Sequence, residues 1–182
     1  MKKHSLHNLS GEQKHQILIT CDKKGNPVGT ETRDICHKGD GKTHLAFMAF
    51  ILDQDKNIIL AKRSGSKSLW SGFWDASVVS HVLEGETPQS AAKRRGKEEM
   101  GIDVEFEDKG AFYYFAKHGE SAENEFCHVL IGKSIQLVDF NSVEIESIRK
   151  VTINDLKKEI LDYPRIFTPW LKIALEKVEI KI

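Results

Sequence analysis

Two adjacent carboxylates, Glu98 and Glu99, lie near the end of a charged segment that we predict to be a helix. Thr87 and Pro88 suit its N-cap and first position, and Gly101 suits the left-handed residue that ends it. Carboxylates in a last helical turn face the negative end of the helix dipole, so they work against the helix that carries them. Because hard divalent cations prefer oxygen ligands, this placement indicates a bound cation.

The same residues also fit a helix surface without a ligand, because Arg94 and Glu98 are four residues apart and could form an ordinary ion pair. On either interpretation we expect Glu98 and Glu99 to lie at an exposed helix end. Replacing both with Gln should then leave the melting temperature nearly unchanged. Turnover should fall at least about a hundredfold if the two carboxylates hold a catalytic metal.

The spacing of the neighbouring residues favours the cation, because it resembles the Nudix box over about residues 80–102. That box reads Gly, five residues, Glu, seven residues, Arg-Glu-apolar, one residue, Glu-Glu, one residue, Gly-apolar. This sequence departs from it at Ser80, Arg95 and Gly96. In Nudix enzymes the box glutamates hold magnesium or manganese against a diphosphate. The resemblance therefore implies metal-binding roles for Glu86, Glu98 and Glu99.

A second pair of carboxylates comes from residues 123–132, where apolar and polar residues alternate as in a β-strand. Glu123 and Glu125 would project from the same strand face into one cleft. The alternative is a solvent-facing edge that carries paired surface acids. His37 and His44 lie upstream, seven residues apart, around a Gly-bearing loop. Loop histidines are usually solvated, but His44 opens a predicted strand and His37 could reach beside it.

The elements around these residues predict one α/β domain over residues 16–182, preceded by a flexible tail at residues 1–15. The apolar run 45–52 reads as a strand buried on both faces, with residues 57–64 as its antiparallel partner. Residues 104–117 read as one or two strands. The remaining predicted strands are 17–22 and 27–33, which form a leading hairpin, then 75–82, 123–132 and 144–151. The predicted later helices are 153–161, opened by Thr152 or Asn154, and 167–178, capped by Thr168.

Composition narrows the classes of partner. Lys+Arg and Asp+Glu both number 27 in 182 residues, so the net charge gives no support for nucleic-acid or membrane binding. Three cysteines, an odd number, and an N-terminal segment without an apolar core favour a cytoplasmic protein with reduced thiols. No apolar run approaches the roughly 20 residues of a membrane span.

Several fragments narrow the resemblance to one branch of the family. HLAF, WSGFWDAS, SHV, AAKRR, ENEFC and FTPWL are similar to type I isopentenyl-diphosphate isomerases and the isomerase-like Nudix hydrolases. The resemblance extends over nearly the whole chain from about residue 17. It implies the Nudix fold, a mixed β-sheet between α-helices, here with an N-terminal hairpin extension.

The isomerases hold a divalent metal with three histidines and two glutamates. The resemblance places these ligands at His37, His44, His81, Glu123 and Glu125. Mixed imidazole and carboxylate ligation suits manganese, iron or zinc as well as magnesium. The resemblance also implies phosphate contacts from Arg33, Arg63, Lys67 and Arg95. Among the aromatic residues, Trp70, Trp74, Tyr114 and Trp170 could flank an isoprenoid chain or stack on a base, and we expect Tyr114 and Trp170 to contact the substrate. Glu99 matches a glutamate that holds a second magnesium.

One position departs from the isomerases in a way that affects chemistry. They carry an acid–base cysteine where this sequence has Val79, and valine cannot exchange a proton. Ser77 and Ser80 are weaker acids, and we expect them to point elsewhere. Glu98 supplies a carboxylate that the isomerases lack and the hydrolases have.

We therefore predict a cytoplasmic, metal-dependent Nudix hydrolase that uses Mg²⁺ or Mn²⁺. Its substrate would be a small nucleoside or isoprenoid diphosphate, with no nucleic-acid or membrane partner. The catalytic groups would be Glu98, Glu99, Glu123 and Glu125, which would hold metal or act as base. Two alternatives stay open: a type I isopentenyl-diphosphate isomerase with an altered acid, and a Nudix protein that binds a diphosphate without turnover.

Overall fold

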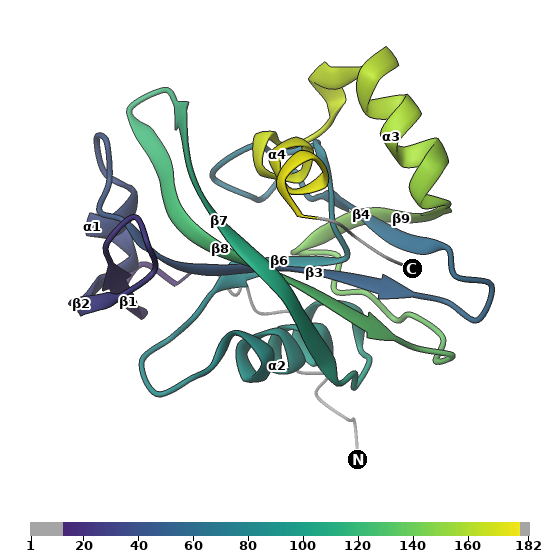
Figure 1. Ribbon diagram of the computed structural model, residues 1–182, viewed down its shortest axis with the longest axis horizontal. Coiled ribbons are helices and arrows are strands. Elements are labelled where there is room, and N and C mark those ends of the chain that lie inside the picture. The colour runs from purple at the N-terminus through teal and green to yellow at the C-terminus, as the bar shows by residue number, and fades with distance from the viewer. Residues whose placement is uncertain (1–12, 179–182) are drawn as a thin grey trace.

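The computed structural model describes residues 13–178, so most of the predicted tail at residues 1–15 lies outside the described residues. Within that part, a nine-stranded mixed sheet lies between helices (Figure 1). The strands are β1 (Ile17–Cys21), β2 (Pro27–Thr32), β3 (His44–Leu52), β4 (Ile58–Arg63), β5 (Trp74–Asp75), β6 (Val78–His81), β7 (Phe106–His118), β8 (Ser121–Lys133) and β9 (Ile145–Val151). The helices are α1 (Arg33–His37), α2 (Pro88–Met100), α3 (Ile153–Asp162) and α4 (Pro169–Lys177), with a 3-10 helix η2 (Pro164–Ile166).

Strand β3 is the centre of the sheet, and each of its nine residues is buried, as its continuous apolar sequence predicts. Alternate side chains enter two different cores because neighbouring strand residues point to opposite faces. Met48 and Phe50 belong to the core that includes Trp170 and Leu171 of α4. Phe47 and its alternating neighbours belong to the core beneath α2. The sheet is therefore covered on one face by α2 and on the other by α3 and α4 (Figure 1).

The predicted pairing of β3 with β4 is wrong for most of its length, since the two strands share only Leu52 opposite Ile58. Strand β8 runs parallel to all of β3, and β6 occupies the other edge opposite residues 46–49. With both edges of β3 taken, β4 pairs instead with β5 and β9. Periodicity identified the strand but could not identify its partners.

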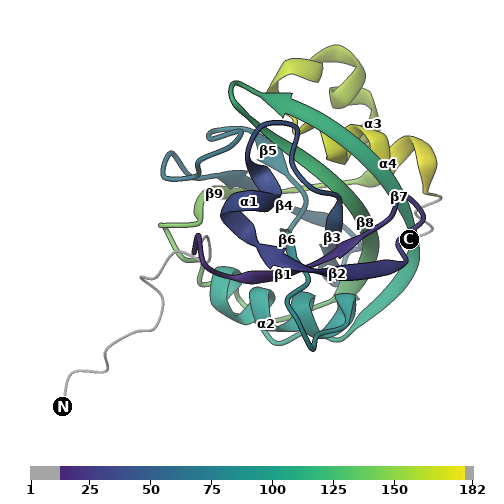
Figure 2. The same cartoon turned by 90° about the vertical axis from the view of Figure 1, so that its left-hand side faces the viewer.

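The segment before β3 also differs from the sequence prediction. The β1–β2 hairpin forms as expected, but residues 33–37 make the short helix α1 rather than a strand end and a loop. Figure 2 shows the hairpin and α1 at the same end of the molecule. The chain then turns through Gly41 at φ +66°, where a Cβ would lie 2.4 Å from the carbonyl oxygen of Cys36. Only glycine fits this return to β3.

The caps of the helices follow the sequence. The Thr87 side chain accepts the Ser90 N–H in a capping box, and Gly101 ends α2 in the left-handed conformation. Thr152 rather than Asn154 caps α3. The predicted segment 104–117 forms one strand, β7, with an irregularity between Asp108 and Ala111. None of the helices within residues 13–178 is long and apolar enough to cross a bilayer.

Candidate active site

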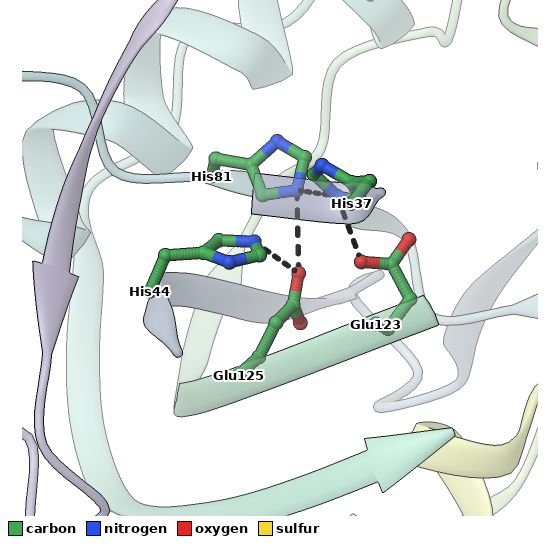
Figure 3. A group of neighbouring side chains, drawn as sticks. All are labelled: His37, His44, His81, Glu123 and Glu125. Carbon is green, nitrogen blue, oxygen red and sulfur yellow. Dashed lines mark hydrogen bonds and ion pairs between the residues drawn. The ribbon is translucent and has the colours of Figure 1, made fainter. Parts of the chain in front are cut away.

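Three histidines and two glutamates meet at one buried point, with their ligand atoms all within 4.8 Å of one another (Figure 3). His37 Nε2 lies 3.1 Å from His81 Nε2 and 2.9 Å from Glu123 Oε2. Glu125 Oε1 lies 3.4 Å from His44 Nε2 and 3.3 Å from His81 Nε2. The structure thus brings together the five residues for which the sequence resemblance implies a metal site.

Strand register explains this convergence. His44 is the first residue of β3 and stands opposite Glu125 of β8. His81 ends β6, and its partner on β3 is Ala46. Glu123 lies two residues before Glu125 on the same face of β8, as its alternation predicts. His37 comes from the last residue of α1, the element that the sequence prediction missed.

The backbone fixes the ring orientation of two of the histidines. His37 Nδ1 lies 2.7 Å from the Arg33 carbonyl oxygen, and His44 Nδ1 lies 2.8 Å from that of Lys42. A carbonyl oxygen only accepts hydrogen bonds, so each Nδ1 donates to the backbone and each Nε2 is directed at the cluster. Histidines that bind metals are held in this way by groups behind them.

The donor atoms of the cluster fit a divalent metal. His44 Nε2 and Glu123 Oε2 are buried and have no hydrogen-bond partner outside the cluster itself. Buried polar atoms are rarely left without a partner, because the lost hydration costs about 1–3 kcal/mol. A divalent cation bound by the two carboxylates and the three imidazole nitrogens would give both atoms a partner.

The ionisation of the cluster also suits metal binding. Burial lowers the pKa of His81 well below its usual value, and the neighbouring histidines add to this effect. Burial acts to raise the pKa of Glu125, but its hydrogen bond with His44 outweighs this and the pKa is lowered. For His37, the nearby Glu123 carboxylate outweighs the effect of burial and raises the pKa. A neutral His81 and an ionised Glu125 are the forms that bind cations.

A pocket of about 410 Å³ opens beside the cluster. Its wall includes His81, Glu123 and Glu125 together with every residue predicted to contact substrate: Arg33, Arg63, Lys67, Arg95, Tyr114 and Trp170. Four cationic side chains in the wall of one pocket would attract an anion, and guanidinium groups match phosphate geometry. The aromatic residues provide an apolar wall for an organic group.

Tyr114 connects this wall to the cluster. It stands opposite Glu125 in the β7–β8 ladder and donates a 2.5 Å hydrogen bond to Glu125 Oε2. Burial and the adjacent carboxylate raise the pKa of Tyr114 well above its usual value, so the phenol keeps its proton. Glu125 therefore uses one oxygen toward the histidines and the other toward a proton donor in the pocket.

The three box glutamates lie outside the five-residue cluster. Glu86 accepts two hydrogen bonds from Arg94, at 2.6 and 3.0 Å, and one from the Leu83 backbone N–H. Glu98 contacts Arg94 and Arg95 at the surface. The Arg94–Glu98 pair is the ordinary ion pair expected for a helix surface without a ligand. These contacts do not prevent a second cation from binding nearby.

Glu98 is exposed as expected, but Glu99 is not at an exposed helix end, which corrects the expectation for that residue. It is 5% exposed, and its Oε1 lies 2.5 Å from Arg95 Nη2. The segment around Asn141 packs over this end of α2, where the Asn141 N–H donates to the Glu99 carbonyl oxygen at 2.8 Å and the Asp139 N–H donates to that of Met100 at 3.1 Å. Glu99 lines a second cavity of about 260 Å³, which shares Arg63, Lys67 and Val79 with the first.

Sequence analysis missed two further carboxylates at this second cavity, Asp75 and Glu144. Glu144 pairs with Lys67 and lies 3.4 Å from Arg95. Neither residue belongs to a spaced motif, and the only signal was that each is the first residue of a predicted strand, 75–82 or 144–151. Ser80 was expected to point away, yet it lines the first pocket together with Val79.

Comparison with known proteins agrees with this arrangement. The family model described as the NUDIX domain matches residues 42–171. The chain is 33% identical over 158 residues to isopentenyl-diphosphate Delta-isomerase 2 of Photorhabdus laumondii, covering 86% of this chain and 89% of that protein. It is 31% identical over 178 residues to the isopentenyl-diphosphate Delta-isomerase of Haloarcula marismortui, covering 92% and 94%.

Solved structures show the same fold. The crystal structure of DR0079 from Deinococcus radiodurans superposes with a TM-score of 0.73 at 20% identity, covering 91% of this chain and 100% of that one. A MutT protein from Methanosarcina mazei gives a TM-score of 0.61 at 18% identity, covering 74% and 91%. The family model, the curated relatives and the fold agree: this chain belongs to the Nudix family, in its isopentenyl-diphosphate isomerase-like branch.

Proposed function

We propose that this protein is a metal-dependent hydrolase of a small organic diphosphate. The observation that carries the proposal is Val79, a side chain without acid–base chemistry in the wall of a pocket otherwise equipped for a diphosphate. Water would attack phosphorus, the bridging P–O bond would break, and the products would be an organic monophosphate and inorganic phosphate. This reaction needs no proton transfer to carbon.

The proposed binding mode follows from the charges around the pocket. Arg63, Lys67 and Arg95 would hold the diphosphate oxygens, with Arg33 nearer the histidines. A divalent ion, Mg²⁺ or Mn²⁺, held by the three histidines with Glu123 and Glu125 would supply a Lewis acid toward a phosphate oxygen. Tyr114 and Trp170 in the same wall would contact the organic group.

The protein would supply the groups that move protons. Glu99 is buried at the adjoining cavity, where burial raises its pKa despite the nearby Arg95. A carboxylate with a raised pKa is a better proton acceptor than an ordinary one at neutral pH. Glu99 would accept a proton from the attacking water, and the exposed Glu98 would help to hold Arg95 toward the phosphate.

A second candidate function is isopentenyl-diphosphate isomerisation, which two observations favour. The curated relatives carry that name. In addition, the Tyr114–Glu125 pair places a phenol proton beside a carboxylate in the pocket, which suits proton exchange with a substrate. Isomerisation would need a second acid–base group in place of Val79. Ser80 lines the pocket and is the first candidate, whereas Cys127 is buried in the core away from it.

One experiment separates these functions. Protein loaded with Mg²⁺ or Mn²⁺ would be incubated in heavy water with nucleoside diphosphates and with isopentenyl diphosphate. Phosphate release and deuterium incorporation would be followed together. Phosphate release without deuterium in an allylic product would support the hydrolase. Robust deuterium incorporation would refute it in favour of the isomerase, and binding without either product would identify a non-catalytic protein.

A further inference from the structure

Asp75 lies behind the wall of the pocket and takes no part in the metal cluster. It is the last residue of β5, it is 2% exposed, and it faces the second cavity. Its carboxylate is hydrogen-bonded on both oxygens. Oδ1 accepts from the Ala76 N–H at 2.9 Å, from Thr168 Oγ1 at 3.0 Å and from Trp170 Nε1 at 2.9 Å. Oδ2 accepts from Trp170 Nε1 at 3.0 Å and from Arg63 Nη1 at 3.3 Å.

Two of these partners are walls of the substrate pocket. Arg63 is one of the cationic residues that line the pocket, and Trp170 is one of the aromatic residues. The Leu69 carbonyl oxygen accepts from Arg63 Nε at 3.2 Å and Nη2 at 2.9 Å, so Asp75 completes a fixed orientation of the guanidinium plane. The same guanidinium lies 5.5 Å from the Trp170 ring centroid. One buried carboxylate thus joins both kinds of wall.

The backbone shows the same connection. The Thr168 N–H donates to the Trp74 carbonyl oxygen at 3.0 Å, next to Asp75, and Trp74 bridges to Phe167. Thr168 stands at the N-cap position of α4, yet its hydroxyl donates to Asp75 instead of capping the helix. Giving up a side-chain cap costs about 1 kcal/mol, so the contact with Asp75 replaces a local interaction with one directed at the site.

We propose that Asp75 is a positioning residue for ligand binding, which holds the Arg63 guanidinium and the Trp170 indole as one hydrogen-bonded unit. The cationic and aromatic sides of the pocket are then set by a single side chain. Groups that orient the residues of a binding site often affect it strongly without touching the ligand. The ligand class rests on the proposed function, a small organic diphosphate, but the positioning itself can be tested without turnover.

The first test is a double-mutant cycle with inorganic pyrophosphate as the probe, using Mn²⁺-loaded full-length protein and calorimetry. In Asp75→Asn the amide oxygen can still accept hydrogen bonds from Trp170 and Thr168. The amide NH₂ group, however, would face the N–H donors of Arg63, so that hydrogen bond is lost. Pyrophosphate affinity should fall about fivefold or more, as expected for coupled contacts. In an Arg63→Met background the same substitution should have almost no further effect, because the residue it acts through is gone.

The matched control is Asp53→Asn. Asp53 is also a buried carboxylate, 8% exposed, and is paired with Lys150 at 2.9 Å, but it does not line the pocket. This variant should bind pyrophosphate like the wild type. An equal loss in both variants, or the same loss from Asp75→Asn with and without Arg63, would overturn the proposal. If the wild type does not bind pyrophosphate, both this proposal and the proposed function fail.

The second test examines Trp170 without any ligand, through hydrogen exchange of its indole N–H by NMR. The resonance would be assigned by its loss in Trp170→Phe. Asp75→Leu removes the acceptor and should speed exchange about tenfold or more, whereas Asp75→Asn should leave it close to the wild-type rate. Equal exchange in all three proteins would refute the positioning role. A protein that shows both effects yet hydrolyses no diphosphate would refute only the proposed function.

Discussion

Replacing Glu99 with Gln should destabilise the fold, whereas the same substitution at the adjacent Glu98 should not. The Glu99 side chain is 6% exposed and its Oε1 lies 2.5 Å from Arg95 Nη2, on a side chain that is 3% exposed. Glu98 contacts the same arginine at 2.7 Å, but its side chain is 45% exposed. The two residues share charge, helix and partner, so burial is the variable that the comparison isolates.

The contacts of Arg95 set the size of the effect. Breaking a buried ion pair costs about 3–5 kcal/mol when it leaves one charge without compensation. Arg95 would keep Glu98 and also Glu144 at 3.4 Å, so its charge stays compensated. Burial also raises the pKa of Glu99, which means that ionising it already costs free energy. We therefore expect a loss of about 1–2 kcal/mol for Glu99→Gln, against about 0–1 kcal/mol for an exposed pair.

The assay is thermal unfolding in the presence of a chelator, which removes any contribution of metal to stability. About 1 kcal/mol corresponds to about 2–4 °C for a chain of this length, so Glu99→Gln should melt about 2–8 °C below the wild type. Glu98→Gln should melt within about 2 °C of it. Equal melting temperatures for the two variants, or a larger loss for Glu98→Gln, would refute the reasoning from burial. Turnover measured well below these temperatures separates a catalytic role from a structural one.

Three further predictions follow from the site. Saturating Mn²⁺, at about a thousand times its Kd, should stabilise the wild type by about 4 kcal/mol, which raises the melting temperature by about 8–16 °C. His81→Gln should lose most of that increase, whereas His128→Gln, at a residue outside the cluster, should keep it. Val79→Cys should leave the metal-induced shift unchanged, because a thiol is close to valine in size, and allylic deuterium from isopentenyl diphosphate should then become detectable by mass spectrometry. Burial raises the pKa of Asp75 to about 6, against an ordinary value of 3.8; its contribution to stability is therefore complete below about pH 4 and is lost as the pH rises through about 6, by up to about 3 kcal/mol. Denaturant unfolding would be measured at pH 4.5 and 7.5. The free energy of unfolding of Asp75→Asn should increase relative to that of the wild type as the pH rises, and the same difference between the two proteins at both pH values would contradict this.

The sequence predicts the local elements of this fold well because their signals are local. The capping of α2, the buried β3 and the shared face of Glu123 and Glu125 each depend on residues within a few positions of one another. The pairing of β4 with β5 and β9 depends on which strands already occupy the edges of β3. That competition is tertiary, and no window along the chain contains it.

The same distinction applies to the candidate site. The five residues of the cluster could be found only through the family resemblance, because they come from α1, β3, β6 and β8. Asp75 and Glu144 had no motif and became visible only when the second cavity brought them beside Arg63 and Lys67. The burial of Glu99 was also out of reach, since it requires the segment around Asn141 to fold over the end of α2.

Under the proposed function, the position of Val79 would let this scaffold keep a binding site while its reaction differs from that of the isomerases. Val79 stands opposite Met48 in the β3–β6 ladder and two residues before His81, so it lies on the same strand face as a residue of the cluster. It lines both cavities, and a cysteine there would bring a thiol beside the bound diphosphate. The arginines, the lysine and the five residues of the cluster all come from other positions, so under the proposed function a change at residue 79 would alter proton transfer and leave the affinity for a diphosphate in place. With an inert side chain at this point, the reaction that we propose for the pocket, transfer of a phosphoryl group to water, needs no acid–base group at residue 79.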